Sequence, residues 1–135
     1  MSQNRVSTEK RDLVRSTSDH EGVATSWGHL SWLLGAGSAP APGVEQTFGV
    51  VTIHPGQRNP LHAHPNCEEL LYVISGTCDH LLGEDLYQLA PGSVIRIPRD
   101  VPHWAKCTSD EPLRVVVSFS SPDRTTTNLE GGELA

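Results

Sequence analysis

The strongest constraint on the fold is the even spacing of short apolar runs between turns that contain glycine or proline. From residue 27 onward these runs are rich in Val, Ile, Leu and Tyr. No segment shows a sustained 3.6-residue apolar period with helix caps. Many short strands at regular spacing are typical of an antiparallel sandwich or barrel. The sequence therefore predicts an all-β chain with strands at 27–34, 46–53, 61–64, 69–75, 77–82, 85–89, 93–97, 103–108 and 113–120.

The 135 residues suffice for one domain but not for two. Residues 1–25 hold few large apolar side chains, and we expect a flexible arm or an edge strand swapped onto a partner subunit. Residues 26–121 form the β-domain. The Gly-, Ala- and Pro-rich segment 35–43 is expected to be a surface loop. Residues 122–135 are predicted to be a loose polar tail.

Charge and composition exclude several partners. Lys and Arg total 10 against 16 for Asp and Glu, so the net charge is −6 and nucleic acid or an anionic membrane is a poor partner. No apolar stretch approaches the roughly 20 residues of a membrane helix, and the N-terminus lacks the apolar centre of a secretory signal. Three cysteines without a CxxC pair favour reduced thiols over a disulfide framework. We therefore expect a cytoplasmic protein.

Two histidines and a glutamate stand close together in the sequence. His62 and His64 are two residues apart, so in a strand both imidazoles point to the same face. Glu69 opens the apolar run 70–74, where an inward carboxylate is costly unless it is paired or coordinated. Each feature has an ordinary explanation alone, as a surface histidine pair or a solvated strand end.

A third histidine, His103, begins a later strand after a turn bounded by two prolines. Taken alone, it would be an ordinary surface or core histidine. Three histidines and a carboxylate on one face suit Fe(II), Mn and similar ions and leave octahedral positions open. No cysteine pair has the spacing of a thiolate zinc site.

At this point the spacing resembles the cupin superfamily. The first cupin motif is similar to Gly56-x5-His62-x-His64-x4-Glu69-x6-Gly76. The second is similar to Gly92-x5-Pro98-x-Asp100-x2-His103-x3-Cys107, with Asp100 where the family usually has Gly and Cys107 where it usually has Asn. Fifteen residues separate the two motifs, and the resemblance covers roughly residues 45–121.

The resemblance implies an antiparallel double-stranded β-helix, or jelly-roll barrel, that is usually dimeric. Carried over residue by residue, its metal ligands are His62, His64, Glu69 and His103. They would hold one divalent transition metal ion, with Fe(II) favoured and Mn, Ni, Zn or Cu as alternatives. The resemblance further implies that the glycines of both motifs lie in turns with unusual backbone angles.

Three functions remain open after the resemblance. The first is a metal-dependent enzyme that acts on a small organic substrate, in the manner of the non-heme cupin dioxygenases. The second is a metal-dependent isomerase, lyase or cyclase with a sugar or polyketide-type substrate. The third is a small-molecule or metal-binding cupin without catalysis. Fold alone does not choose among them.

The remaining candidates have ordinary interpretations. Cys107 shares the strand face of His103, where a buried small side chain is its expected role. Cys67, two residues before Glu69, has no base or charge partner that the sequence identifies. The other histidines are interpreted as structural or surface residues, with His29 alone placed where it could reach the mouth of the barrel; they are His20, His29, His54 and His80.

Overall fold

A computed structural model describes residues 13–19, 21–35 and 43–134 of the chain. Strands dominate it, and no helix among these residues is long and apolar enough to cross a membrane. The elements are η1 (Thr17–Asp19), β1 (Val23–Ala24), β2 (Gly28–Leu34), β3 (Thr47–Ile53), β4 (His62–Ala63), β5 (Glu69–Ser75), β6 (Cys78–Leu82), β7 (Asp85–Leu89), β8 (Val94–Ile97), β9 (His103–Cys107), β10 (Leu113–Phe119) and β11 (Thr127–Asn128).

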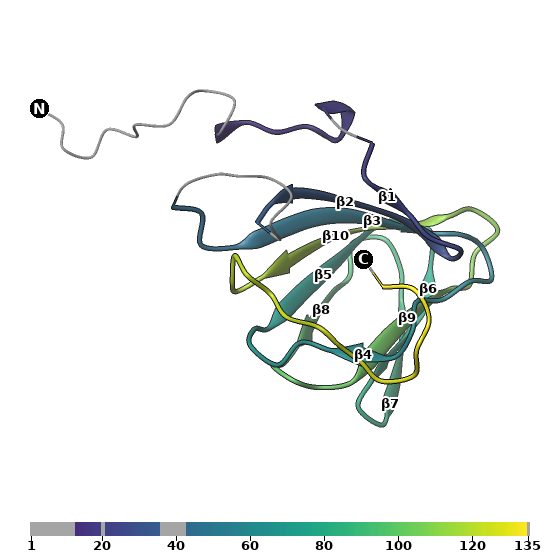
Figure 1. Cartoon of the computed structure of the whole chain (residues 1–135). Coiled ribbons are helices and arrows are strands. Elements are labelled where there is room, and N and C mark those ends of the chain that lie inside the picture. Colours follow the sequence, from purple (N-terminus) through teal and green to yellow (C-terminus); the bar gives the residue numbers. More distant parts are fainter. Residues whose placement is uncertain (1–12, 20, 36–42, 135) are drawn as a thin grey trace, which may run out of the picture.

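The strands form two antiparallel sheets that face each other around one interior (Figure 1). One sheet has the order β1-β2-β3-β10-β5-β8, and the other has the order β11-β4-β9-β6-β7. Neighbours such as β3 and β10 are far apart in the sequence, so each sheet depends on long-range pairing. This arrangement confirms the predicted all-β jelly-roll fold.

Strand alternation decides which side chains enter the barrel. In β5, Glu69, Leu71 and Val73 are buried, whereas the residues between them are exposed. The same alternation buries Leu113, Val115, Val117 and Phe119 of β10, which pairs with β5. Glu69 is thus carried inward by the same pattern that builds the apolar core, although it is a carboxylate.

The C-terminal segment differs from the predicted loose tail. Residues 122–134, which we call the C-terminal strap, cross the mouth of the barrel, and β11 pairs with β4 (Figure 1). Glu130 forms an ion pair with Arg58 at 2.7 Å, and the Trp27 indole N–H donates to the Glu133 carbonyl at 2.8 Å. The polar composition of the strap did not predict this ordered structure, because the strap is held by backbone groups and charged side chains of distant segments rather than by apolar burial.

The N-terminal arm is described only in part. Residues 1–12 and 20 lie outside the described residues, as does the segment 36–42 of the predicted surface loop. Where it is described, the arm forms an edge strand, since β1 pairs with β2 of the same chain. A swap onto a partner subunit stays a prediction.

The turn residues of both motifs have the backbone angles that the resemblance implies. Gly56, Gly76 and Gly92 have φ of 77°, 77° and 94°. Asp100, at the position where the family usually has Gly, has φ of 63°, the one positive value at a non-glycine residue of the described chain. In this conformation the Asp100 N–H donates to the carbonyl of His64 at 2.9 Å, so the second motif braces the first.

We expect residue shape to matter at position 100 because the left-handed region is open to Gly and tolerated by Asp, but costs a β-branched residue about 1–2 kcal/mol. Asp100→Gly should keep the free energy of unfolding within about 0.5 kcal/mol of the wild type, and Asp100→Val should lower it by about 1–2 kcal/mol. Urea denaturation measures both. Asp85→Val, in an exposed strand position, is the control; an equal loss there would contradict the explanation.

Candidate metal centre

Both sheets contribute to a cluster of three histidines and one glutamate inside the barrel. His62 lies on β4 directly opposite His103, the first residue of β9. His64 follows β4 immediately, and Glu69 opens β5 in the other sheet. All four are buried, with 3–7% of each residue exposed. The structure therefore brings together the four residues that the sequence singled out.

The functional atoms of this cluster converge on one point. One nitrogen from each of His62, His64 and His103 lies within 4.8 Å of the other two, a spacing that could hold a metal ion. Glu69 Oε1 lies 3.4 Å from His64 Nε2 and 3.2 Å from His103 Nε2. These separations place the carboxylate oxygen beside two of the imidazole nitrogens.

Backbone carbonyls set the tautomer of each imidazole. The Nδ1–H of His62 donates to the Pro60 carbonyl at 2.7 Å, and that of His103 donates to the Val101 carbonyl at 2.9 Å. The His64 Nδ1–H donates to the carbonyl of Thr125 in the strap at 3.0 Å. Because a carbonyl can only accept, each neutral ring keeps its proton on Nδ1 and has a lone pair on Nε2. Hydrogen bonds of this kind orient histidine ligands in metal sites.

The cluster stabilises a positive charge at its centre. Burial alone would raise the pKa of Glu69, but its close contacts with the His103 and His64 imidazoles outweigh burial and hold this pKa well below its usual range. Burial lowers the pKa of His103, but the contact with the Glu69 carboxylate outweighs burial and raises this pKa. Burial, and then the charge of His103, lower the pKa of His62 to about 3. A proton shared by Glu69 and His103 thus balances the negative charge of the carboxylate, and a bound cation would balance it in the same way.

The donor set fits a divalent metal ion. His64 Nε2, His103 Nε2 and Glu69 Oε1 are fully buried and form no well-oriented hydrogen bond with the described residues. Buried acceptors that face one another are costly unless a cation lies between them. Imidazole and carboxylate together suit Fe, Mn, Ni, Cu and Zn. The geometry therefore agrees with metal binding and does not distinguish among these ions.

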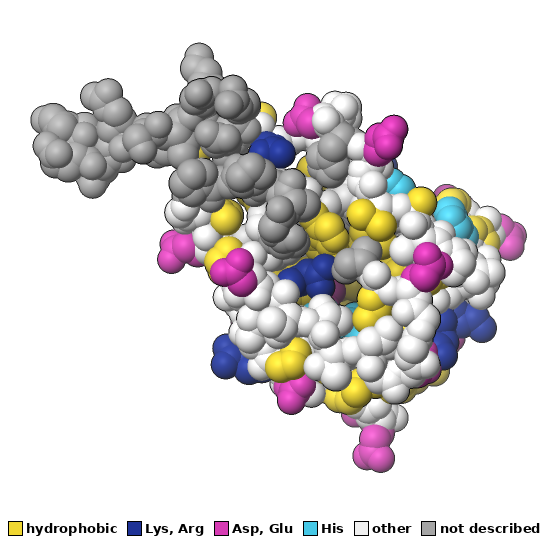
Figure 2. Space-filling model, in the orientation of Figure 1, with side chains coloured by type: hydrophobic (Ala, Val, Ile, Leu, Met, Phe, Trp, Pro, Cys, Tyr) yellow, Lys and Arg dark blue, Asp and Glu magenta, His cyan; other side chains and the backbone are white. Residues whose placement is uncertain are grey.

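A small cavity adjoins the cluster. Its volume is about 50 Å³. Apolar side chains such as Trp27, Trp32 and Leu71 line it, together with His62, His64 and Glu69 of the cluster. Figure 2 looks into this hollow, where hydrophobic, basic and histidine side chains come to the surface together. At roughly 10–15 Å³ for each enclosed water, the space suits a small molecule of a few atoms.

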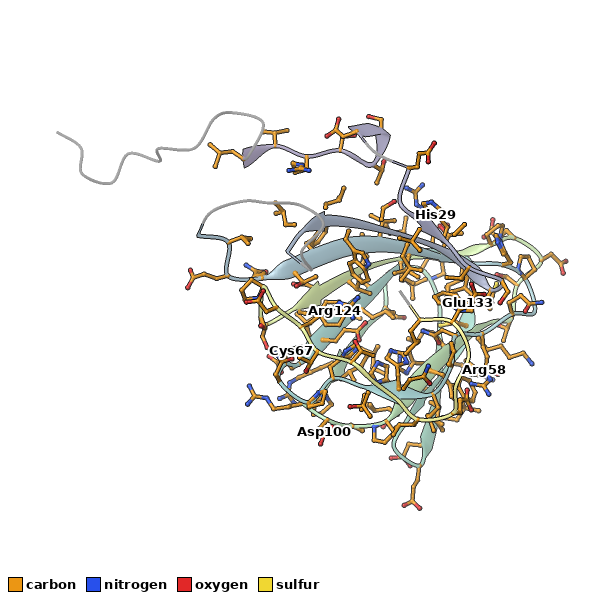
Figure 3. The ribbon with its side chains drawn as sticks, in the orientation of Figure 1. His29, Arg58, Cys67, Asp100, Arg124 and Glu133 are labelled. Carbon is orange, nitrogen blue, oxygen red and sulfur yellow. The ribbon has the colours of Figure 1, made fainter. Side chains whose placement is uncertain are left out.

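Sequence reasoning missed three residues of this cavity. Arg124, Thr126 and Leu134 line it, and all three belong to the C-terminal strap. In Figure 3 Arg124 extends from the C-terminal strap toward the interior of the barrel. No local motif marks these residues, because they reach the site only when the strap folds across the mouth.

The cysteines have structural roles. Each is free, and each is at most 1% exposed. Cys78 and Cys107 are register partners across β6 and β9, and burial raises the pKa of the Cys78 thiol to about 12. Burial also raises the pKa of Cys67. Thiols with a raised pKa are poor nucleophiles. Cys107 is fully buried, which agrees with the core role expected of it.

Two histidines outside the motifs differ in position. The His29 ring lies on β2 and donates a hydrogen bond to the Glu21 carbonyl at 2.6 Å, rather than to a residue of the cluster (Figure 3). His80 is 1% exposed and stacks on His103, with ring centroids 5.9 Å apart. His80 thus packs against the predicted ligand His103, a contact that strand alternation alone did not reveal.

The comparisons with known proteins agree with this fold and site. The Cupin domain family model matches residues 49–119, so the chain belongs to the cupin family. Germin-like protein 5-1 of Oryza sativa subsp. japonica is 33% identical over 100 residues, which are 67% of this chain and 45% of that protein. The chain spans about half the length of the curated relatives it matches.

Solved structures show the same fold at lower identity. A recombinant oxalate oxidase in complex with glycolate has a TM-score of 0.77 at 22% identity, over 90% of this chain and 66% of the other. Oxalate decarboxylase of Bacillus subtilis, studied for its Mn(II) centres, has a TM-score of 0.75 at 22% identity, over 83% of this chain and 30% of the other. An oxalate decarboxylase with Mn(II) centres is therefore among the structural neighbours of this chain.

The buried His80 predicts how the stability of the metal-free protein depends on pH. Burial, and then the charge of His103, lower the His80 pKa from 6.5 to about 4. Between these values the unfolded chain binds a proton that the folded chain does not, so stability falls as the pH falls from 6.5 to 4. His80→Leu should remove this contribution, worth about 3 kcal/mol at pH 4.

Urea denaturation of EDTA-treated protein at several pH values measures the effect. The difference between His80→Leu and wild type should shift in favour of the variant as the pH falls. His54→Leu removes an exposed imidazole and is the matched control. If both variants respond to pH in the same way, the burial of His80 is not the cause.

Proposed function

We propose that this protein is a metal-dependent oxidoreductase of the dioxygenase type that acts on a small organic substrate. One divalent ion, Fe(II) in the first place, is held by His62, His64, Glu69 and His103. The observation that carries the proposal is the convergence of buried lone pairs on one point beside a small cavity. When bound, the ion supplies Lewis acidity and open coordination positions for substrate and dioxygen.

The chain's own residues prepare this site. The carbonyls of Pro60, Val101 and Thr125 hold the three imidazoles in the tautomer that presents Nε2 to the centre. Glu69 balances the charge, and among the described residues that line the cavity it is the one carboxylate that could take a proton from a bound substrate. The apolar wall and the strap cover part of the cavity, and such low-dielectric surroundings strengthen the electrostatic interactions inside it.

Oxygen chemistry is favoured by the fold neighbour that is an oxalate oxidase. The alternative is a lyase or isomerase in which the metal polarises a carbonyl without dioxygen. A specific observation favours it too, because another neighbour with the same fold is an oxalate decarboxylase. Both functions use the same four ligands, and a binding protein without catalysis would use them as well.

The ligand assignment predicts metal content. Wild-type protein loaded with Fe(II), Mn(II) or Zn(II) and freed of excess ions should retain about one equivalent, measured by mass spectrometry. His62→Ala and His103→Ala should each reduce retention at least tenfold, because a lost ligand also leaves its partners' lone pairs unbalanced. His54→Ala, in an exposed turn, is the control and should retain the metal. Wild-type protein that stays metal-free would refute the assignment.

The loaded protein then separates the functions. It is incubated with a panel of enediols, diketones and phenols, with and without air, while oxygen uptake and product are recorded. Turnover that requires and consumes oxygen supports the oxidoreductase. Turnover that persists without air supports the lyase or isomerase, and metal retention without any turnover supports a binding protein.

We also propose that the chain forms a homodimer, as the family resemblance implies. Leu70, Tyr72 and Ile74 of β5 and Val94 of the neighbouring β8 form an exposed apolar row, 44–61% accessible, on the outer face of the six-stranded sheet. A row of this kind is typical of an interface. Tyr72→Lys should yield monomers by size-exclusion chromatography with light scattering, whereas Leu86→Lys, an exposed position on β7, should not. A monomeric wild type would contradict the proposal.

A further inference from the structure

Cys78 and Cys107 are two free, buried cysteines that lie outside the metal centre and its cavity. They are register partners on β6 and β9, antiparallel strands that lie side by side in the five-stranded sheet (Figure 1). Directly opposed residues of an antiparallel pair extend their side chains to the same face of the sheet. Both thiols therefore enter the core from opposed positions on neighbouring strands.

The hydrogen bonds around these two residues show which kind of pair they form. On an antiparallel ladder, opposed residues alternate between hydrogen-bonded and non-hydrogen-bonded pairs. The Thr108 N–H donates to the Thr77 carbonyl at 3.0 Å, so the adjacent pair is a hydrogen-bonded one. The Cys107 N–H instead donates to the Gln57 carbonyl at 2.9 Å, away from β6. Cys78 and Cys107 are therefore a non-hydrogen-bonded pair.

A non-hydrogen-bonded pair has the spacing of a disulfide. Its Cα atoms lie about 4.5 Å apart, and its side chains are closer than those of a hydrogen-bonded pair. A disulfide needs Cα atoms roughly 4.4–6.8 Å apart. Neither strand has to move to meet this requirement, and only the side chains have to rotate. The Cys107 thiol also contributes to the raised pKa of Cys78, so the two sulfurs lie within electrostatic range of each other.

The third cysteine is placed differently. Cys67 lies between β4 and β5, and it is not among the residues that pair β6 with β9. The charges that act on its pKa belong to Arg124, Glu69 and Arg99, and not to either of the other cysteines. Cys67 therefore serves as an internal control for any reaction of the pair.

The surroundings of Cys107 tolerate the loss of its thiol proton. In the reduced protein this thiol donates weakly to the Glu111 carbonyl, with the sulfur 3.4 Å from the oxygen. The Ser109 hydroxyl donates to the same carbonyl at 2.8 Å. Oxidation of Cys107 would thus remove one weak hydrogen bond and leave the Glu111 carbonyl with a stronger one.

We propose that Cys78 and Cys107 are a covalent modification site, at which a cross-strand disulfide forms by exchange with a low-molecular-weight disulfide of the glutathione type. The thiolate of one cysteine attacks the reagent, breaks its S–S bond and releases one thiol. The second cysteine thiolate attacks the mixed disulfide, forms the intramolecular bond and releases the other thiol. Two cysteines are oxidised, one reagent molecule is reduced, and the two cysteine protons end on the released thiols.

The bond would join two strands that reach the metal centre. β9 begins with the ligand His103, and β6 carries His80, which stacks on it. Both thiols are buried, and burial raises the pKa of Cys78 to about 12, so exchange is slow once the barrel has folded. The bond therefore forms while the chain folds, and the folded protein keeps the redox state in which it folded. This inference does not depend on whether the four ligands hold a metal.

The test refolds the full chain from urea in a mixture of oxidised and reduced glutathione, with refolding in a reducing buffer as the reference. Acid stops the exchange, and free thiols are then labelled with N-ethylmaleimide in denaturant and counted by mass spectrometry of the intact chain. Wild-type protein should carry three labels after reductive refolding, and one after oxidative refolding because two of its three cysteines are paired. Peptide mapping should place the bond between Cys78 and Cys107.

Matched variants and melting temperatures assign the bond. Cys67→Ala should form it and carry no label, whereas Cys78→Ser and Cys107→Ser should each lack it. Oxidised wild-type protein should melt about 5–10 °C above the reduced protein, because closure of the loop between the two cysteines restricts the unfolded chain. Cys67→Ala should show the same increase, and Cys78→Ser should melt at one temperature after either treatment.

The wild-type protein alone can overturn the proposal. Three labels after oxidative refolding would do so, as would a bond to Cys67 or a bond between two chains on a non-reducing gel. A lower melting temperature in the oxidised protein would contradict the claim that neither strand has to move. Folded, reduced protein kept in the same glutathione mixture for the same time should retain three labels, and rapid pairing there would refute slow exchange in the folded barrel.

Discussion

The structure depends on one costly interaction, the burial of the Glu69 carboxylate among three imidazoles. A lone carboxylate inside an apolar barrel would be protonated or expelled. Here it lies 3.2 Å from His103 Nε2 and 3.4 Å from His64 Nε2, and the group as a whole requires a positive charge at its centre. That requirement is met by a shared proton or by a divalent ion, so metal binding and protonation compete at the same point.

The two sheets have different tasks around this interaction. The five-stranded sheet brings two of the histidines opposite each other on β4 and β9, and its turns supply the carbonyls that orient the rings. The six-stranded sheet supplies Glu69 and the apolar wall of the cavity. The metal centre therefore lies between the sheets, where movement of either would disturb it. The left-handed turn at Asp100 adds a direct brace, since its N–H binds the His64 carbonyl.

The C-terminal strap joins this framework from outside the matched family domain. Its Thr125 carbonyl orients His64, and Arg124 and Thr126 enter the cavity from the same segment. A cupin barrel can keep its four ligands while a strap of different sequence alters the polar groups above them. Such a division explains how one fold serves many substrates, since function lies in the site rather than in the fold.

Much of the fold and of the candidate metal site could be predicted from the sequence. Local spacing alone placed nine strands close to their observed bounds, because glycine and proline turns and β-branched runs act over a few residues. The alternation of β5 put Glu69 on the same face as Leu71 and Val73, and the two motifs named the four residues that meet in the barrel. These features depend on neighbours in the chain, so the sequence contains them directly.

Tertiary structure decided the remainder. The strap has no apolar pattern, and its order arises from pairing with β4 and from bonds to Arg58 and Trp27, which lie more than 70 residues away in the sequence. The stacking of His80 on His103 and the entry of Arg124 between Trp32 and Phe119 likewise join distant segments. The sequence by itself thus determined the barrel and its candidate ligands, because period and spacing are local. The walls and the charge of the cavity were decided only when distant segments packed together.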